Sequence, residues 1–396
     1  MLPPMRKLTW FIMLGVIAVP VLTIWLTLTW PREPSYNGKS LTYWLEHYFP
    51  PPTSMIGSYV ASDPQAVEAI RKIGTNGIPT LLRHIRAHDP PLKLKLVAFA
   101  EKQHLVTVEV PGGGVGYAIP LQPATPQKQK RRLRIQFTPA VVRHQWAELG
   151  FMLLGPAGSN AVPSLVEVLD AGTWGTAQWS AVRALGAIGP AATPAAPAIL
   201  RALAATNNMD QGRCLWALGQ IHGHPESVVP VLIKHLNQRN FEQVAAEALG
   251  QFGPEAAPAV PDLIRILDRN DATSTRAASA LGHIGPAAKQ AIPSLLRGAP
   301  KTNRDSEFRF QCILALGGIH QEPELVVPAL TNCISETLRE QDVRIRLFCA
   351  EALGQYGTNA TPAVALLTKL LADQNPNVRR AATNALQQIS PPTAAP

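Results

Sequence analysis

The side chains that could bind a metal ion or act as nucleophiles are ten histidines and four cysteines. The histidines are scattered, and the closest pair, His222 and His224, has no third ligand in sequence range, although a zinc site needs at least three protein ligands. The sequence contains no Cys-x-x-Cys motif, and no Ser/His/Asp, Cys/His or paired-carboxylate arrangement stands out. We therefore predict no metal site, no cofactor and no catalytic centre.

Three of the cysteines share one position of a repeated sequence, four residues before a Leu-Gly pair: Cys214, Cys312 and Cys349. Other copies have alanine at this position, so we expect these cysteines to be small buried residues. Cys214 and Cys312 lie three repeats apart, which is too far for a disulfide. Cys333 could pair with either Cys312 or Cys349, and the sequence does not decide between them.

A row of basic residues is the repeated pattern that could bind a ligand. Four residues after the start of the second helix of each repeat stand Arg83, Glu167, Arg201, Lys234, Arg265, Arg297, Asn332 and Lys369. Helical geometry turns this position away from the apolar face. If the second helices line the concave side, a strip of Arg201, Lys234, Arg265, Arg297 and Lys369 could bind an acidic segment of a partner protein or a polyanionic glycan. The alternative is a solvated helix face, because cations are favourable near a helix C-terminus.

A second basic cluster comprises Lys128, Lys130, Arg131, Arg132 and Arg134. It could bind anionic lipid or an acidic partner, or it could be a solvated loop. Before it, residues 105–110 and 117–122 alternate like the strands of a hairpin around the run Pro-Gly-Gly-Gly-Val-Gly. That run does not predict a phosphate-binding loop, because no Lys-Ser/Thr pair follows it.

One repeated segment makes up most of the chain and must position these residues. Residues 245–267, AAEALGQFGPEAAPAVPDLIRIL, serve as the example. The turn position of the segment recurs at Gly155, Gly189, His222, Gly253, Gly285, His320, Gly357 and Ser390, with a period of 31 to 37 residues. A period in this range is typical of a solenoid.

Each copy predicts two helices joined at an angle. In the example, Ala245, Ala248 and Leu249 have helical spacing, and the small residues allow a neighbouring backbone to come close. The pair Gly253-Pro254 ends this helix, and Pro261 begins the next one, where the missing amide proton costs nothing. His222 and His320 replace the turn glycine, so we expect them to adopt positive φ. One such helix pair cannot bury both of its faces, so the copies are expected to stack.

The run Leu-Gly-x-Ile-Gly-Pro-x-Ala-x-x-Ala-x-Pro-x-Leu-x-x-Leu resembles the short HEAT repeat of the bilin lyases of phycobiliproteins. The resemblance covers residues 146–390, with a weaker copy at residues 69–85, and it implies an all-α solenoid. Residues 36–48, YNGKSLTYWLEHY, resemble the segment before the repeats of membrane-anchored bacterial HEAT-repeat proteins, which implies a cap on the first repeat. HEAT-repeat hydroxylases bind iron through His-Glu pairs, and this sequence has no His-Glu dipeptide. The repeat itself implies little about function.

The segment from Leu8 to Trp30 contains no charged residue and is long enough to cross a bilayer as a helix. A cleaved signal peptide would have a shorter apolar stretch and a small-x-small cleavage site. Arg6 and Lys7 precede the segment, which favours a cytoplasmic N-terminus and places the rest of the chain outside the cytoplasm. We therefore predict a single-pass membrane protein.

The net charge of +9 is unevenly distributed. Residues 144–396 hold nineteen basic and twenty acidic side chains, so the repeat array is nearly neutral and nucleic acid is an unlikely partner. The predicted organisation is a basic flank (1–7), a transmembrane helix (8–30), a linker (31–39), a cap helix with a degenerate first repeat (40–102), an insertion (103–138), the HEAT-like array (139–390) and a tail (391–396).

Taken together, these patterns predict a membrane-anchored, non-catalytic α-solenoid that binds a protein partner along its concave surface. The alternative is an enzyme or chaperone of the bilin-lyase type that acts on a bound prosthetic group or a protein substrate. A deep apolar cleft with convergent polar groups would favour the enzyme, whereas a long open groove would favour the scaffold.

Overall fold

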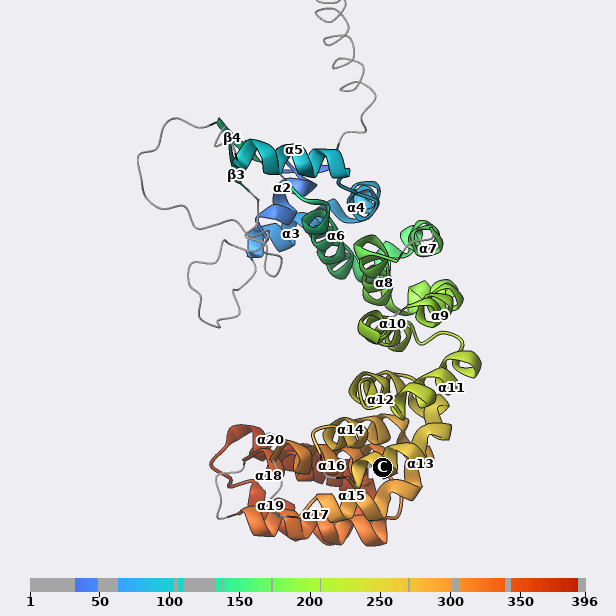
Figure 1. The fold of residues 1–396 in the computed structure, drawn as a ribbon. Coiled ribbons are helices and arrows are strands. Elements are labelled where there is room, and N and C mark those ends of the chain that lie inside the picture. Colours follow the sequence, from blue (N-terminus) through green and yellow to red (C-terminus); the bar gives the residue numbers. More distant parts are fainter. Residues whose placement is uncertain are drawn as a thin grey trace, which may run out of the picture. The chain divides into compact units, whose positions relative to one another are not determined.

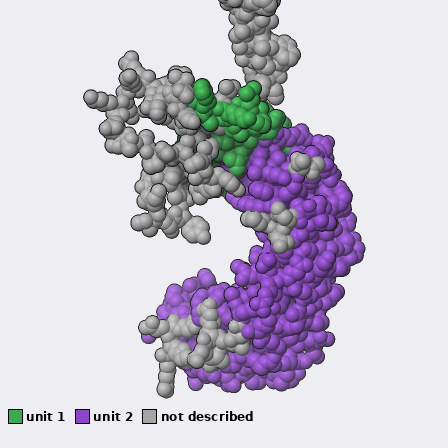
Figure 2. All heavy atoms as spheres, in the orientation of Figure 1, with its two compact units in different colours: residues 1–84, 88–142 green, residues 85–87, 143–396 purple. Residues whose placement is uncertain are grey.

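The structure is a computed structural model that describes residues 33–48, 63–102, 106–109, 133–136, 138–171, 174–206, 208–269, 271–300, 306–338 and 343–390. The chain forms two compact units, residues 1–84 with 88–142 (unit 1) and residues 85–87 with 143–396 (unit 2), which are coloured separately in Figure 2. The predicted transmembrane segment Leu8 to Trp30 lies outside the described residues.

Unit 1 begins with a small hairpin where we expected a linker. Strands β1 (Ser35–Tyr36) and β2 (Lys39–Ser40) pair in antiparallel fashion around Asn37 and Gly38, which both have positive φ. An Asn-Gly pair favours this tight turn. The hydroxyl of Ser40 then caps α2 (Leu41–Glu46) by accepting a hydrogen bond from the backbone N–H of Tyr43.

The degenerate first repeat consists of α3 (Pro64–Ile73), a 3-10 turn η1 (Gly74–Gly77) and α4 (Ile78–Ile85), and α5 (Pro91–Lys102) follows it. Leu41 and Trp44 of α2 are buried, and α2 packs on α3. A β-carbon on Gly77 would lie 2.9 Å from Cδ2 of Leu41. In unit 1, α2 therefore covers part of the first repeat.

The insertion holds a strand pair that the sequence patterns did not predict. Strand β3 (Val106–Glu109) pairs with β4 (Leu133–Gln136), and the pairing is parallel. Residues 133–136 alternate apolar and polar, which is itself a strand pattern, and residues 110–132 are long enough for the connection that parallel strands need. Residues 117–122 lie outside the described part of the chain.

Unit 2 holds the repeat array, in which first and second helices alternate (Figure 1). The first helices are α6 (Ala140–Leu154), α8 (Thr176–Ile188), α10 (Asn208–Ile221), α12 (Glu242–Gln251), α14 (Ser274–Ile284), α16 (Ser306–Ile319), α18 (Val343–Gln355) and α20 (Pro376–Ile389). The second helices are α7 (Val162–Asp170), α9 (Ala196–Ala205), α11 (Pro225–Leu236), α13 (Val260–Leu267), α15 (Ile292–Gly298), α17 (Pro323–Thr337) and α19 (Val364–Leu370).

The turns between the helices follow the prediction and add one element to it. The turn glycines, for example Gly189 and Gly285, have positive φ, and so do His222 and His320. After each turn glycine a 3-10 segment leads into the second helix: η2 (Gly155–Ala161), η3 (Gly189–Ala195), η4 (Gly253–Ala259), η5 (Gly285–Ala291) and η6 (Gly357–Ala363). The two copies with histidine have no such segment, and their second helices begin directly at Pro225 and Pro323.

The Ala-Leu-Gly motif packs one first helix against the next. A β-carbon on Gly219 would lie 2.8 Å from the Cα of Ala248, and one on Gly282 would lie 2.8 Å from the Cα of Ala315. In each pair, the glycine after the leucine faces the alanine before the leucine of the following repeat. The first helices therefore lie with their backbones almost in contact, as the small residues predicted.

The second helices of neighbouring repeats make far fewer contacts with one another than the first helices do. Because the first-helix layer is the more closely spaced one, unit 2 by itself curves toward that layer, as Figure 1 shows for α8, α10, α12 and α14 beside α7, α9, α11 and α13. The inner surface of the array therefore belongs to the first helices.

A buried polar position also joins successive repeats, seven residues before the leucine of each Leu-Gly pair. Ser274 donates a hydrogen bond to the carbonyl of Ile266 (2.9 Å), and Arg346 donates one to the carbonyl of Thr337 (2.8 Å). Both side chains begin a first helix and bind a carbonyl near the end of the preceding second helix. They satisfy carbonyl groups that a helix end otherwise leaves without partners.

Among the described residues, one helical stretch, Ala140–Asp170, is long and apolar enough to cross a membrane by length and composition. It comprises α6, η2 and α7, and Gly155 with positive φ breaks it into two helices. We assign it to the first helix pair of the array, because neither helix alone has the about 20 residues that a span requires.

Candidate functional site

Grooves between neighbouring first helices form the surface of the first-helix layer. Positions are counted from the leucine of each Leu-Gly pair, and from Leu386 in α20, where glutamine follows the leucine. Side chains at positions −2 and +2 of one helix flank each groove, and position −5 of the next helix contributes its floor. Position −5 holds Ser180, Arg213, Val244, Arg276, Gln311, Phe348 and Ala381 along unit 2. The side chain at this position thus differs in size and charge from one groove to the next.

The groove between α12 and α14 is filled by the chain itself. Arg276 at position −5 forms an ion pair with Glu247 at position −2, with 3.9 Å between Nη1 and Oε2. On its far side, His283 Nδ1 lies 2.8 Å from the carbonyl oxygen of Ser279. The carboxylate of this groove thus has an internal cationic partner.

Aromatic rings occupy the groove between α16 and α18. Phe348 at position −5 stacks on Phe310, with ring centroids 5.2 Å apart and planes inclined by 21°. The guanidinium of Arg344 lies 5.3 Å from the centroid of Phe310, within the range of a cation–π interaction, and also pairs with Glu307. This groove is filled by apolar contacts.

The groove between α18 and α20 is open. Ala381 stands at position −5, and its small side chain leaves a cavity of about 210 Å³. The cavity is lined by Glu351, Gln355, Ala381, Asn384, Ala385 and Gln388. The carboxamide of Gln355 lies against Gly317 of α16, and that of Gln388 lies against Gly354 of α18. Glycine has no side chain, which leaves room for each carboxamide. One carboxylate and three carboxamides therefore line a space that Arg276 fills between α12 and α14 and that Phe348 fills between α16 and α18.

Glu351 is the ionisable group of this open groove. Partial burial raises the pKa of its carboxyl group above the ordinary value, and the positive charge of Arg380 opposes that shift. Glu351 forms no ion pair with the described part of the chain, and Gln355, Asn384 and Gln388 make no hydrogen bond to it. The groove thus presents hydrogen-bonding groups that the described fold does not use.

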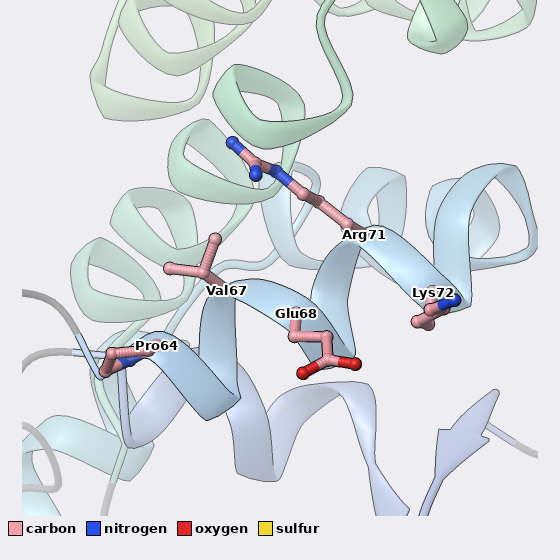
Figure 3. A pocket seen from close by; sticks show the side chains of 5 residues that line it. All are labelled: Pro64, Val67, Glu68, Arg71 and Lys72. Carbon is pink, nitrogen blue, oxygen red and sulfur yellow. The ribbon is translucent and has the colours of Figure 1, made fainter.

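A second hollow lies on unit 1 and offers less chemistry. It has a volume of about 660 Å³ and is lined by Pro64, Val67, Glu68, Arg71 and Lys72. Figure 3 shows that these residues all come from α3, with the side chains of Arg71 and Lys72 directed away from each other. Because a single helix lines this hollow, its polar groups do not converge on one point.

The predicted basic strip lies on the second helices, and so on the outer layer of unit 2 rather than on its inner surface. The expected concave position is therefore wrong, because close Gly–Ala packing puts the first helices inside. Lys234 and Lys369 are exposed and form no ion pair with the described part of the chain.

The arginines of the strip have partners in the preceding repeat. Arg201 pairs with Asp170 (3.1 Å), and Arg297 pairs with Asp268 (2.9 Å). Arg265 bonds to Asn237 and pairs with Asp262 (2.9 Å). These contacts connect consecutive second helices, which favours the solvated-face interpretation over a free cationic strip. Each is solvent-exposed, so each contributes little to stability.

The other predicted basic cluster falls mostly on residues that the structure does not describe. Lys128, Lys130, Arg131 and Arg132 lie outside the described residues, and Arg134 lies in β4. Its role as a binding loop stays a prediction.

All four cysteines are buried and none forms a disulfide, which confirms the assignment of Cys214, Cys312 and Cys349 as small core residues. A hydrogen bond with Cys349 lowers the pKa of the Cys333 thiol, against the opposing effect of burial. Of the two possible partners of Cys333, the structure thus places Cys349 beside it. Within the described residues, no group of three or more His, Cys, Asp or Glu side chains could hold a metal ion.

Sequence reasoning missed both the open groove and the buried polar position. A signal for each was present, because alanine at position −5 and polar residues at position −7 are visible when the repeats are aligned. The sequence pattern within one repeat predicts its helices, but both features depend on the contact between two repeats.

Comparison with known proteins gives a family match at the C-terminal end. A family model described as HEAT repeats matches residues 333–396. No curated protein matches the chain.

Three solved structures show a distant similarity. A structure of Kap95p with RanGDP is 12% identical, covers 64% of this chain and 38% of its own, and has a TM-score of 0.41. The Kap95:Nup1 complex is 10% identical, with coverage of 88% and 55% and a TM-score of 0.39. Human deoxyhypusine hydroxylase is 21% identical, with coverage of 58% and 96% and a TM-score of 0.27. The chain therefore spans 38% and 55% of the two Kap95 chains that it resembles.

TM-scores below 0.5 establish neither a common global fold nor a common function, so the assignment depends on the repeat itself. The last two repeats match the HEAT-repeat model, and the same alternation of first and second helices extends back to Ala140. The repeats at the C-terminal end are therefore HEAT repeats.

Proposed function

We propose that this protein is a membrane-anchored, non-catalytic scaffold that binds a segment of a partner protein along the first-helix surface of unit 2. The predicted anchor is Leu8 to Trp30, and the array then lies outside the cytoplasm. The observation that carries the proposal is the open groove between α18 and α20, with one carboxylate and three carboxamides that have no use in the described fold.

The shape and chemistry of the described surface support binding rather than catalysis. Catalysis on a prosthetic group would call for a deep apolar cleft with a few convergent polar groups. The open groove is small and polar, with exposed side chains at Glu351 and Gln355. The first-helix surface continues beyond this groove along unit 2, which suits an extended partner segment. We therefore keep the lyase-type enzyme only as the alternative that the sequence raised.

Site-specific photocrosslinking tests which layer binds the partner. We expect a photoreactive residue in place of Gln251, on the first-helix surface, to capture a discrete partner from native membranes. The same residue in place of Lys234, on the second-helix surface, is the matched control and should capture none. Both side chains are exposed, so neither replacement disturbs the core. Crosslinks from Lys234 alone would contradict the proposal and would restore the outer basic strip as the binding surface.

Membrane extraction tests the anchor. If residues 8–30 span the bilayer, the protein stays in the membrane fraction after washing with alkaline carbonate, because about 20 apolar residues anchor a helix firmly. Its mature N-terminus, determined by mass spectrometry, should still include Arg6. A soluble protein that begins near Pro31 would identify the segment as a cleaved signal peptide.

A further inference from the structure

We propose that the open groove between α18 and α20 binds an arginine side chain of the partner protein, with Glu351 as its carboxylate acceptor. This inference rests on the proposed function and names the chemistry that the partner must supply. It follows from a comparison of two equivalent grooves within the same molecule.

The groove between α12 and α14 shows what the open groove lacks. Glu247 and Glu351 both stand at position −2 of their helices, and Arg276 and Ala381 both stand at position −5 of the next helix. In the first groove the guanidinium of Arg276 pairs with Glu247. In the second groove, the side chain of Ala381 is too short to contact Glu351 and carries no charge. Glu351 therefore faces a cavity of about 210 Å³ instead of a cation.

The other positions of the open groove suit a guanidinium. An arginine side chain presents five N–H donors in a fixed plane, and a carboxylate can accept two of them side by side. Asn384 and Gln388 line the same cavity, and their carboxamide groups can accept the remaining donors. A lysine ammonium group has three donors that do not lie in one plane, so it would satisfy fewer of these acceptors.

Arg380, whose charge acts on Glu351, does not line the cavity. Arg380 acts on Glu351 only through its charge, because it forms no ion pair with it. A cation from a partner therefore completes an arrangement that Arg276 completes internally elsewhere.

A peptide pair measures this recognition directly on the full chain in detergent micelles. The probe is acetyl-Ala-Ala-Arg-Ala-Ala-amide, and the control replaces the arginine with citrulline, which has the same shape but no charge. We expect ligand-observed NMR titrations to show binding of the arginine peptide, and binding at least about tenfold weaker for the citrulline peptide. Equal binding of the two peptides would overturn the inference.

Three variants locate the binding site. Glu351→Gln should weaken the arginine peptide about tenfold, because it removes the charge and keeps the shape. Glu247→Gln is the matched control and should leave binding unchanged, since Arg276 already occupies Glu247. Ala381→Arg supplies the missing guanidinium from within and should abolish binding. Full binding by Glu351→Gln or by Ala381→Arg, with circular dichroism unchanged, would overturn the inference.

The peptide and crosslinking experiments fail independently. If Gln251 captures a partner but the arginine peptide does not bind, the scaffold proposal stands and the arginine site is wrong. If the peptide binds through Glu351 but Gln251 captures nothing, the groove is a site for guanidinium groups and the scaffold proposal fails.

Discussion

Replacing Gly282 with alanine is expected to lower the free energy of unfolding by about 1 to 3 kcal/mol, although alanine is the better helix former. The added β-carbon would lie 2.8 Å from the Cα of Ala315 and 3.2 Å from its Cβ. Backbone atoms cannot move aside as the tip of a side chain can, so α14 and α16 must separate. Chemical denaturation measures the loss, and hydrogen exchange should show it first in the repeats that flank Gly282.

Gly212→Ala is the matched control for this prediction. Gly212 also lies in a first helix, but a β-carbon there would meet no atom within 4 Å. The same substitution should therefore be neutral or stabilising, by up to about 1 kcal/mol, since alanine has less conformational entropy to lose. If the two variants had the same stability, the Ala-Leu-Gly motif would not be the contact that sets the spacing of the repeats.

The sequence predicted the helices of this fold because each one depends on short-range signals. Glycine at the turn, proline at the start of the second helix and leucine at helical spacing all act within one repeat, and the structure confirms each of them at Gly253, Pro261 and Leu263. His222 and His320 were predicted in the same way, because few residue types tolerate positive φ. The partner of β3 was missed because a strand pairing depends on residues far apart in sequence.

The binding surface was harder to predict, since it depends on how neighbouring repeats touch. The basic strip was predicted from a single position of the repeat. Its acceptors Asp170 and Asp268 stand at another position, some thirty residues before their arginines, and that pattern does not include them. Which layer lies inside follows from the relative spacing of the two helix layers, and a single repeat does not contain that information. Aligning every position across the repeats would have shown Ala381 where other copies have larger side chains.

The ion pair of Arg346 and Asp373 is the other place where a single change should have a large effect. Both side chains are 7% exposed, and Arg346 Nε lies 2.7 Å from Oδ2 of Asp373. Asp373→Asn is expected to destabilise the last repeats by about 3 to 5 kcal/mol, because it leaves a buried guanidinium without its counter-ion. Asp170→Asn is the matched control, since Asp170 pairs with Arg201 at 49% exposure. There the loss should be at most about 1 kcal/mol.

The same ion pair predicts how stability depends on pH. Burial alone would raise the pKa of Asp373, but the hydrogen bonds from Arg346 and from the backbone N–H of Asn375 hold it below its ordinary value. A carboxyl group with a lowered pKa contributes its full stability above the pKa of the unfolded chain, about 3.9, and loses it as the pH falls through the folded-state pKa. Denaturation of the wild type and of Asp373→Asn at a series of pH values should therefore give a stability difference that is constant near neutral pH and shrinks below about pH 4. A difference that stayed constant down to pH 2 would show that the charge of Asp373 does not stabilise the array.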